Sequence, residues 1–254
     1  MAKVLIHKKH TELVDGKIRV ISKARQYYVA DPTKDFHCSE GLLKKSDLKK
    51  SKVKTNKGFE FYIFDATFAD RYRRIARGPQ TIPLKDIGLI IATTGLNQES
   101  KVVDAGAGSG ALAIALANIA KEVHTYDIND THLAIAQENV KKLEIKNCIV
   151  KKHDITKSIP EKNVDLVNLD MPEPWLVIPH AIKALKKGAW LVSYSPTIPQ
   201  VMDFCAAVHK REELFIVKTI ELIERYWEID ERRVRPKTEG IGHSGFLTFV
   251  RKVW

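Results

Sequence analysis

Short apolar runs separated by turn-forming residues dominate the first 66 positions of the chain. Sequences typical of turns, VDG at 14–16 and DPTKD at 31–35, divide these runs. The runs are rich in β-branched and aromatic residues and predict strands at 3–7, 17–23, 26–30 and 59–65. Residues 1–66 are therefore expected to form a small β-rich domain, either a barrel or a curled sheet.

From residue 67 onward, helical periodicity alternates with short apolar strands. Helices are predicted first at 67–77 and 84–96, and strand-like runs close the chain at 215–229 and 243–252. Between them, strands are predicted at 101–106, 122–127, 147–152, 165–170 and 189–195. The intervening helical segments are expected at 110–120, 130–143, 175–188 and 197–210. This alternation predicts an α/β fold in which residues 67–254 form a mostly parallel, doubly wound sheet.

A glycine-rich turn joins the strand at 101–106 to the helix that follows it. The sequence from 102 to 110 reads VVDAGAGSG. Glycines let a ligand approach the main chain closely, and the free amides of a helix start add partial positive charge there. The spacing is not the G-x-G-x-x-G of dinucleotide folds. The pattern is thus compatible with a nucleotide-like ligand and also with a tight turn that binds nothing.

Carboxylates stand at the ends of four successive predicted strands, as Asp104, Asp127, Asp154 and Asp170. Open α/β sheets bind ligands at the carboxyl ends of their strands. Asp127 follows Asp104 by 23 residues (127 − 104), close to the spacing of about 20 for an acid that reaches ribose hydroxyls. Each acid alone is equally compatible with a helix cap or a solvated loop. Together they predict a nucleoside-binding site.

Composition narrows the class of protein further. The chain has 254 residues, of which 44% are hydrophobic and 29% charged, as in an ordinary globular protein. No run approaches the roughly 18 apolar residues of a membrane span, and the N-terminus lacks the apolar stretch of a signal peptide. We therefore expect a cytoplasmic protein without a membrane partner. Cys38, Cys148 and Cys205 lack metal-ligand spacing, so no metal site is expected.

Positive charge is concentrated in the first part of the chain. Residues 1–75 contain 18 Lys and Arg against 9 Asp and Glu, a net charge of +9 out of a total of +11. A polyanion that contacts this part is the natural partner. The segment from Leu42 to Gly58 carries seven lysines and one acid, Asp47. It reads as a solvated loop or as an arm that contacts phosphates.

Several phrases also carry a family resemblance. They are the glycine turn, RGPQ at 77–80, DMPEPW at 170–175, YSPTIPQ at 194–200 and the closing GHSGFLTFVRK at 242–252. The chain resembles class I S-adenosylmethionine-dependent methyltransferases. More narrowly, it resembles the tRNA adenine-N1 methyltransferases that modify position 58 and, in archaeal members, also position 57. The resemblance covers nearly the whole chain and implies a Rossmann-like catalytic domain with a small N-terminal β domain, tRNA as substrate and a homotetramer.

The resemblance implies S-adenosylmethionine as the cofactor. It places the glycines of the turn beneath the methionine part, Asp127 at the ribose hydroxyls and Asp154 at the adenine amino group. The implied cofactor-binding residues are Gln80, Asp104, Gly106, Gly108, Ser109, Gly110, Asp127, Ile128, Asp154 and Ile155. Bacterial relatives tend to have a tyrosine and a proline three and four residues after the glutamine. This chain has Pro83 and Leu84 there, so no stacking role is carried over.

Asp170 is expected to carry the chemistry. N1 of adenine has an available lone pair at neutral pH, so attack on a sulfonium methyl needs no base. Positive charge then develops on the ring and its amino group, and a fixed carboxylate in a dry pocket stabilises that charge. The base has to be extruded from a folded loop, at a cost that contacts with the RNA backbone offset. Candidate substrate-binding residues are Lys44, Lys45, Lys49, Lys50, Trp175, Arg235 and His243.

Two alternatives stay open at this stage. One is a class I methyltransferase that acts on a protein isoaspartyl group or a corrinoid, although the basic N-terminal part and DMPEPW at 170–175 argue against it. The other is a non-catalytic tRNA-binding homologue, which is expected to have lost the glycines or Asp170, whereas both are present. The sequence also leaves open whether position 57 is methylated and which oligomer forms.

Overall fold

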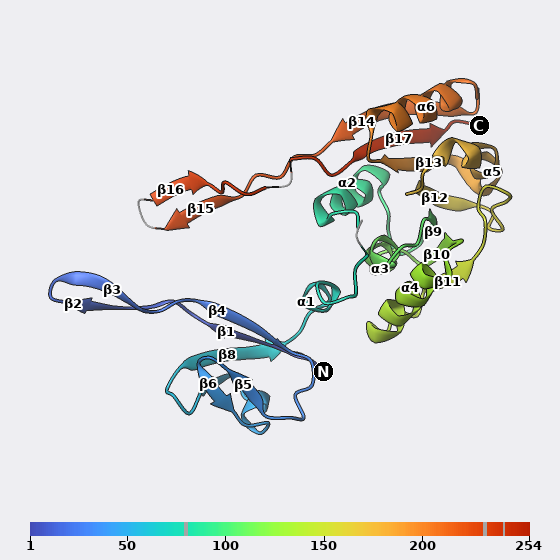
Figure 1. Cartoon of the computed structure of the whole chain (residues 1–254). Coiled ribbons are helices and arrows are strands. Elements are labelled where there is room, and N and C mark those ends of the chain that lie inside the picture. Colours follow the sequence, from blue (N-terminus) through green and yellow to red (C-terminus); the bar gives the residue numbers. More distant parts are fainter. Residues whose placement is uncertain (79–80, 231–232, 241) are drawn as a thin grey trace. The chain divides into compact units, whose positions relative to one another are not determined.

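The computed structural model describes residues 1–78, 81–230, 233–240 and 242–254, and the chain forms two compact units (Figure 1). We call Met1–Arg74 the N-terminal unit and Ile75–Trp254 the C-terminal unit. Helix α1 (Phe68–Tyr72) belongs to the N-terminal unit, whereas the sequence pattern placed the boundary before it, at residue 67. A capping box between Thr67 and Asp70 begins this short helix.

The N-terminal unit is built on one antiparallel sheet in the order β4-β1-β8-β7. Its strands are β1 (Lys3–His7), β4 (Arg25–Val29), β7 (Lys52–Lys54) and β8 (Glu60–Asp65). Two further hairpins are β2 (His10–Val14) with β3 (Lys17–Ser22) and β5 (Phe36–Cys38) with β6 (Gly41–Leu43). The β2–β3 hairpin extends from this unit as a ribbon (Figure 1). The expected small β-rich fold is therefore present.

The lysine-rich segment 42–58 differs from the loop or arm expected of it. It contains the end of β6, a 3-10 turn η1 (Asp47–Lys49) and strand β7, which pairs with β8. Leu43, Leu48 and Val53 recur at five-residue intervals and are buried in the core with Phe61. The segment is thus anchored by its apolar residues, while its lysines stay on the surface.

The C-terminal unit contains a seven-stranded sheet in the order β11-β10-β9-β12-β13-β17-β14, in which β17 alone runs opposite to the other six strands. The strands are β9 (Lys101–Ala105), β10 (Glu122–Asp127), β11 (Cys148–Lys152), β12 (Val164–Leu169), β13 (Leu185–Ser195), β14 (Leu214–Glu221) and β17 (Phe246–Lys252). The chain reverses its direction of travel across the sheet between β9 and β12. Such a switch point opens a crevice for ligands at the carboxyl ends of the strands.

Helices cover both faces of this sheet (Figure 1). They are α2 (Leu84–Thr94), α3 (Ala111–Ala117) and α4 (Asp130–Lys142) on one face and α5 (Ile178–Ala184) and α6 (Ile198–His209) on the other. The arrangement follows from right-handed crossovers on either side of the switch point. No helix in the described part of the chain is both long and apolar enough to span a bilayer.

Two sequence expectations about the C-terminal unit are wrong. The helix expected at 175–188 ends at Ala184, and β13 begins with the next residue, because Leu185 pairs with Val164 ahead of a register shift. The strand expected at 215–229 is two strands, since β14 ends at Glu221. Its second part, β15 (Trp227–Asp230), pairs with β16 (Arg233–Pro236) in a hairpin that the apolar pattern did not separate.

Candidate functional site

The glycine turn, Gly106–Gly110, follows β9 and lies against the end of β12. Gly106 has φ +88°, and a side chain there would place its Cβ 1.9 Å from the backbone oxygen of Asp170. The amides of Gly106 and Ala107 both donate to the carbonyl of Tyr126, and the Asp170 amide donates to Ala105 at 2.8 Å. Only glycine combines this conformation with so close an approach. The turn and Asp170 are consequently held together through their backbones.

The second half of the turn is fixed by α4 and by Asp127. The amide of Gly108 donates to a carboxylate oxygen of Asp127 at 3.0 Å, and the other oxygen accepts from the Asn129 amide at 2.9 Å. Gly110, with φ +75°, caps α3, and a Cβ there would lie 3.1 Å from the Cβ of Ala136. Asp127 at the end of β10 therefore meets the turn that follows β9.

Asp104 lies beneath the turn, in the sheet itself. It is 1% exposed, and its two oxygens accept from the Thr125 hydroxyl at 2.7 Å and the Asn168 amide at 3.1 Å. Both partners stand directly opposite it, on β10 and β12. Burial raises the pKa of Asp104 to about 6, against the effect of these two hydrogen bonds. This carboxyl group is enclosed by protein, whereas the sequence pattern suggested a ligand contact.

Asp170 follows β12 at the same edge of the sheet. Its side chain makes no hydrogen bond or ion pair with any residue that the structure describes, and the residue is half-buried. Burial, and secondly the charge of Asp104, raise the pKa of Asp170 to about 7. A carboxylate with free acceptor capacity thus stands beside the glycine turn, where a ligand can use it.

Asp154 and the two isoleucines occupy the neighbouring part of the edge. Asp154 caps a turn by accepting from the amide and hydroxyl of Thr156, and the Thr156 hydroxyl lowers its pKa. Ile155 is buried in the core cluster below the sheet edge, whereas Ile128 is 68% exposed beside Asp127. Asp127, Ile128 and Asp154 therefore border the edge, and Ile155 supports it from within.

Asn139 on α4 joins one further segment to the glycine turn, and no sequence motif marked this residue. Its Oδ1 accepts from the Ala76 amide at 2.9 Å, and its Nδ2 donates to the carbonyls of Ala76 and Ser109, each at 2.8 Å. Ser109 is itself 5% exposed. The segment that leads into RGPQ is thereby attached to the glycine turn. Gln80 lies outside the described residues, so its expected cofactor contact stays a prediction.

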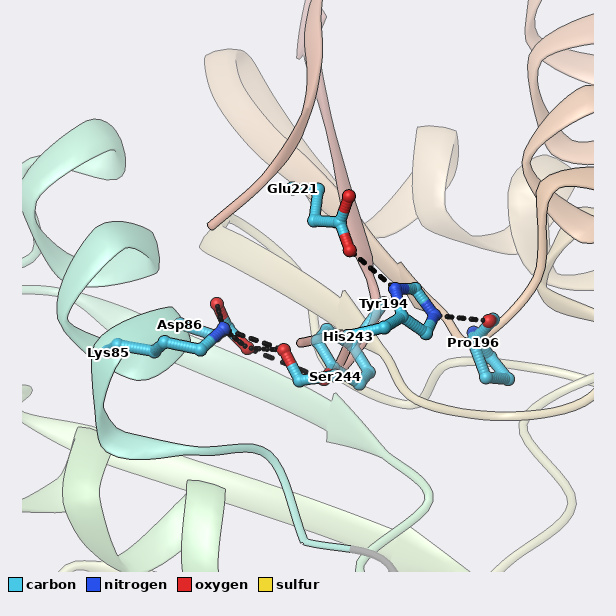
Figure 2. A network of polar contacts seen from close by, with 7 residues as sticks. All are labelled: Lys85, Asp86, Tyr194, Pro196, Glu221, His243 and Ser244. Carbon is cyan, nitrogen blue, oxygen red and sulfur yellow. Dashed lines mark hydrogen bonds and ion pairs between the residues drawn. The ribbon is translucent and has the colours of Figure 1, made fainter. Parts of the chain in front are cut away.

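A polar network joins α2, β13 and the segment before β17 (Figure 2). Lys85 on α2 lies 2.8 and 3.0 Å from the two carboxylate oxygens of Asp86 and donates to the Ser244 hydroxyl at 2.6 Å. Ser244 donates in turn to Asp86 at 2.9 Å, and the Tyr194 hydroxyl lies 3.4 Å from the same oxygen. A Cβ on Gly245 would meet the Tyr194 ring at 2.4 Å. The network fixes the segment before β17 against α2 and β13.

His243, the residue before Ser244, makes two separate polar contacts (Figure 2). Its Nδ1 lies 2.5 Å from a Glu221 oxygen and its Nε2 2.8 Å from the carbonyl of Pro196. Both partners can only accept, so both ring nitrogens must carry protons, and the Glu221 contact, followed by the carbonyl, raises the pKa of His243. His243 is exposed, but both of its ring nitrogens already have partners within the chain, and a contact with substrate stays a prediction.

Two further substrate candidates, Trp175 and Arg235, stay predictions. Trp175 is half-buried and packs against the core cluster of the C-terminal unit. Arg235 on β16 donates to Glu228 at 2.8 Å within the β15–β16 hairpin. Among the described residues, no three His, Cys, Asp or Glu side chains gather as metal ligands would. The candidate site is therefore the glycine turn with Asp127 and Asp170.

Two basic cavities lie in the N-terminal unit. One, of about 500 Å³, is lined by Lys3, Lys45 and Lys49. The other, of about 480 Å³, we call the lysine groove; it lies at the base of the β2–β3 hairpin and is lined by Lys8, Lys9, Lys54 and Lys57 with His7, His10, Phe59 and Tyr62. Of the predicted lysines, Lys44, Lys45, Lys49 and Lys50 are all exposed, and Lys50 pairs with Asp47 at 2.9 Å.

Comparisons with known proteins identify relatives of this chain. A family model described as the tRNA methyltransferase complex GCD14 subunit matches residues 74–235. The chain is 35% identical to the tRNA (adenine(57)-N(1)/adenine(58)-N(1))-methyltransferase TrmI of Methanocaldococcus jannaschii, over 92% of this chain and 94% of that protein. It is 29% identical to the tRNA (adenine(58)-N(1))-methyltransferase TrmI of Thermus thermophilus, over 79% of this chain and 80% of that protein.

Solved structures give the same picture. The tRNA (m1A58) methyltransferase TrmI from Aquifex aeolicus superposes with a TM-score of 0.77 at 25% identity, covering 99% of this chain and 97% of that one. A SAM-dependent O-methyltransferase from Thermotoga maritima superposes with a TM-score of 0.79 at 23% identity, covering 99% and 93%. The second likeness concerns the fold alone. The expected class I methyltransferase fold is confirmed.

Proposed function

We propose that this chain, which belongs to the family of the tRNA methyltransferase complex GCD14 subunit, methylates N1 of adenine 58 in the T-loop of tRNA with S-adenosylmethionine as methyl donor. We include adenine 57 as a second target. The relative named for both positions is 35% identical to this chain, and the Thermus relative named for position 58 alone is 29% identical.

The observation that carries the proposal is the free carboxylate of Asp170 beside the glycine turn. A non-catalytic homologue would have no use for a half-buried acid that lacks a partner among the described residues. The backbone of the turn, in contact with the Asp170 carbonyl, fixes where this acid stands. The geometry thus supports an enzyme over a binding module.

The residues present fit S-adenosylmethionine. Gly108 has open space where a side chain would lie, with only the Gly106 oxygen at 3.9 Å, so a ligand can approach the main chain there. Asp127 and Asp154 stand at the ends of adjacent strands, where the ribose hydroxyls and the adenine amino group would be held. When bound, the cofactor supplies an electrophilic methyl group on a sulfonium. Asp104 would support this site from within the sheet, because it is 1% exposed and its oxygens accept from Thr125 and Asn168.

Asp170 would orient the adenine and stabilise the charge that it acquires. N1 would offer its lone pair without help from a base. As N1 takes the methyl group, the S–C bond breaks, the sulfonium leaves as a neutral thioether and the adenine ring becomes cationic. The ionised carboxylate would accept from the exocyclic amino group and so orient N1. Because the acid is half-buried, its interaction with the developing charge is stronger than it would be in water.

The lysine groove would hold the RNA backbone. Its four lysines are all exposed, and the acid in its lining, Glu60, is paired with Lys52 at 3.0 Å. Lys8 lies 4.8 Å from the centre of the Tyr62 ring, so an aromatic surface accompanies the charge. Clustered lysines beside aromatic rings favour a nucleic acid, because phosphates take the charge and exposed bases take the rings. We therefore propose that tRNA contacts the lysine groove as well as Lys44, Lys45, Lys49 and Lys50, which were predicted from the sequence.

Self-association into a tetramer is part of the proposal. Both long hairpins expose large apolar side chains, namely Leu13, Val20 and Ile21 on β2–β3 and Trp227, Ile229 and Val234 on β15–β16. Exposed apolar surface of this kind supports a protein partner, and closed symmetric homo-oligomers are the commonest form. Sedimentation equilibrium would give the number of subunits.

The test is methyl transfer from labelled S-adenosylmethionine to an unmodified tRNA transcript, followed by nuclease digestion. Label in 1-methyladenosine is expected. Transcripts with guanine at position 58, at position 57 or at both separate the two targets, and the double replacement should accept no label. Transfer to protein, or to no acceptor while the enzyme binds the cofactor, would overturn the proposal.

A further inference from the structure

Asn139 uses its whole amide group to join three segments. The residue is 1% exposed on α4, and its oxygen and both of its N–H groups are bonded to the backbone of Ala76 and Ser109. A buried amide with every hydrogen bond satisfied fixes the groups around it, since breaking one bond leaves a buried polar atom unpaired. The geometry of this contact is therefore closely constrained.

The two segments that Asn139 joins to α4 lie outside any helix or strand. Ser109 stands between Gly108 and Gly110, which both have positive φ and no side chain to restrict them. Ala76 lies outside any helix or strand, before α2. One turn earlier on the same helix, Ala136 packs against Gly110. Helix α4 thus contacts the glycine turn at two points and also binds the segment 75–78.

We propose that Asn139 is a positioning residue for the cofactor site, which holds the glycine turn and the segment 75–78 in the arrangement that binds S-adenosylmethionine. The inference rests on the proposed function in one respect, that the turn binds this cofactor. Asn139 does not touch the cofactor itself. Its effect is on binding affinity, because a turn that is already ordered loses less freedom when the ligand binds.

The chain provides a matched control in Asn147. Its Nδ2 donates to the carbonyls of Ala117 and Ala120, each at 2.8 Å, at the far end of the helix that the glycine turn begins. Asn139→Asp and Asn147→Asp therefore remove the same kind of double amide–carbonyl contact and place a carboxylate against two carbonyl oxygens. Only Asn139→Asp removes a contact with the glycine turn itself.

The experiment measures cofactor affinity by calorimetry and unfolding temperature for both variants and the wild type. Both variants should unfold at lower temperature. Asn139→Asp should weaken affinity for S-adenosylmethionine at least about tenfold, while kcat at saturating cofactor stays within about threefold of wild type. Asn147→Asp should bind within about twofold of wild type. Unchanged affinity in Asn139→Asp, or equal weakening in both variants, would overturn the proposal.

Hydrogen exchange tests the contact without any ligand. Asn139→Asp should speed exchange of the amides at 75–78 and 106–110, and Asn147→Asp should not. If Asn139→Asp does not fold, Ala76→Pro removes the N–H that donates to Oδ1, besides fixing φ at position 76, and should likewise weaken cofactor affinity and speed exchange of these amides. Wild-type protein that fails to bind the cofactor would contradict the proposed function. The exchange pattern would still decide whether Asn139 orders the turn.

Discussion

The carboxyl edge of the C-terminal sheet and the basic surface of the N-terminal unit are built in opposite ways. At the sheet edge, backbone contacts fix the parts, and Gly106 lies so close to the Asp170 carbonyl that no side chain fits between them. On the N-terminal unit, the lysines of the groove are exposed on flexible side chains. The first region depends on position and the second on charge.

This difference predicts how each region responds to substitution. A group that must stand at one place fails abruptly when it is displaced, because orientation enters the rate exponentially. Exposed charges act additively and are screened by salt. Substitutions at the sheet edge should therefore cause large losses of activity that do not depend on the salt concentration. Substitutions on the basic surface should weaken tRNA binding in proportion to the charge removed, and added salt should weaken it in the same way.

Gly106→Ala should have the largest effect. The left-handed conformation alone costs roughly 1–3 kcal/mol for a residue with a side chain, and the new Cβ would meet backbone that cannot move aside. We expect loss of cofactor binding together with a lower unfolding temperature. Calorimetry and thermal unfolding would check both, with Gly188→Ala as control, since Gly188 also has positive φ, +79°, but open space around it. Wild-type affinity in Gly106→Ala would show that the turn is looser than its contacts indicate.

Asp170→Asn should leave cofactor binding intact and lower kcat at least about 100-fold. The amide keeps the shape of the side chain but loses the charge that balances the cationic adenine, and removing one such group typically costs a factor of about 100 to 1,000. Single-turnover methylation of the tRNA transcript, at saturating enzyme, measures the chemical step. A kcat near that of wild type, with normal cofactor affinity, would contradict the role of Asp170.

The same residue should set the pH dependence of the reaction. Since the pKa of Asp170 is about 7 and its ionised form is the active one, kcat/KM should rise with pH through 7 and then level off. One pH unit below the midpoint, about one tenth of the plateau should remain. Asp104→Asn removes the charge that helps to raise this pKa, so its profile should shift to lower pH. If the pH profile of Asp104→Asn coincides with that of the wild type, the charge of Asp104 does not affect the pKa of Asp170.

Replacing the groove lysines should have the smallest effect and the one most dependent on salt. Glutamine at Lys8, Lys9, Lys54 and Lys57 should weaken tRNA binding, and the slope of log affinity against log salt should fall by up to about 3 if all four contact phosphates. Filter binding at several salt concentrations gives both quantities. Glutamine at Lys44, Lys45, Lys49 and Lys50 tests the sequence-based prediction in the same assay.

The matched control variant replaces four exposed lysines near the amino ends of the strands in the C-terminal sheet. They are Lys121, Lys141, Lys146 and Lys162. Equal changes in the salt slope for the groove and control variants would assign the effect to net charge alone. A changed kcat with an unchanged slope would show that the groove acts on catalysis.

Much of the fold was legible in the sequence because buried strands have simple patterns. The strands expected at 3–7 and 122–127 match β1 and β10 residue for residue. The β15–β16 hairpin was missed because its apolar residues continue the pattern of β14 without a break, although they are exposed. A pattern of apolar residues in the sequence shows which side chains are apolar. Whether those side chains are buried depends on which other parts of the chain pack over them.

Some residues of the candidate site could likewise be predicted from the sequence, and others could not. Chain order places the glycine turn, Asp127 and Asp170 at one edge, and so they could be found from the sequence. Asp104 was expected at the ligand, but strand register sets Thr125 and Asn168 beside it, and register is not visible in one strand. The Asn139 contacts link residues 63 positions apart in the chain, for which the sequence offers no local signal.

The place of β17 has a consequence for how the protein is made. This strand is hydrogen-bonded to β13 on one side and to β14 on the other. It follows the end of β13 by 51 residues (246 − 195). A ribosome takes about 3 to 10 s to add that many residues. During that interval β13 has an open edge with an apolar sequence, which other chains could pair with. Factors that slow elongation between residues 195 and 246 should therefore lower the yield of native protein without changing the stability of what has folded.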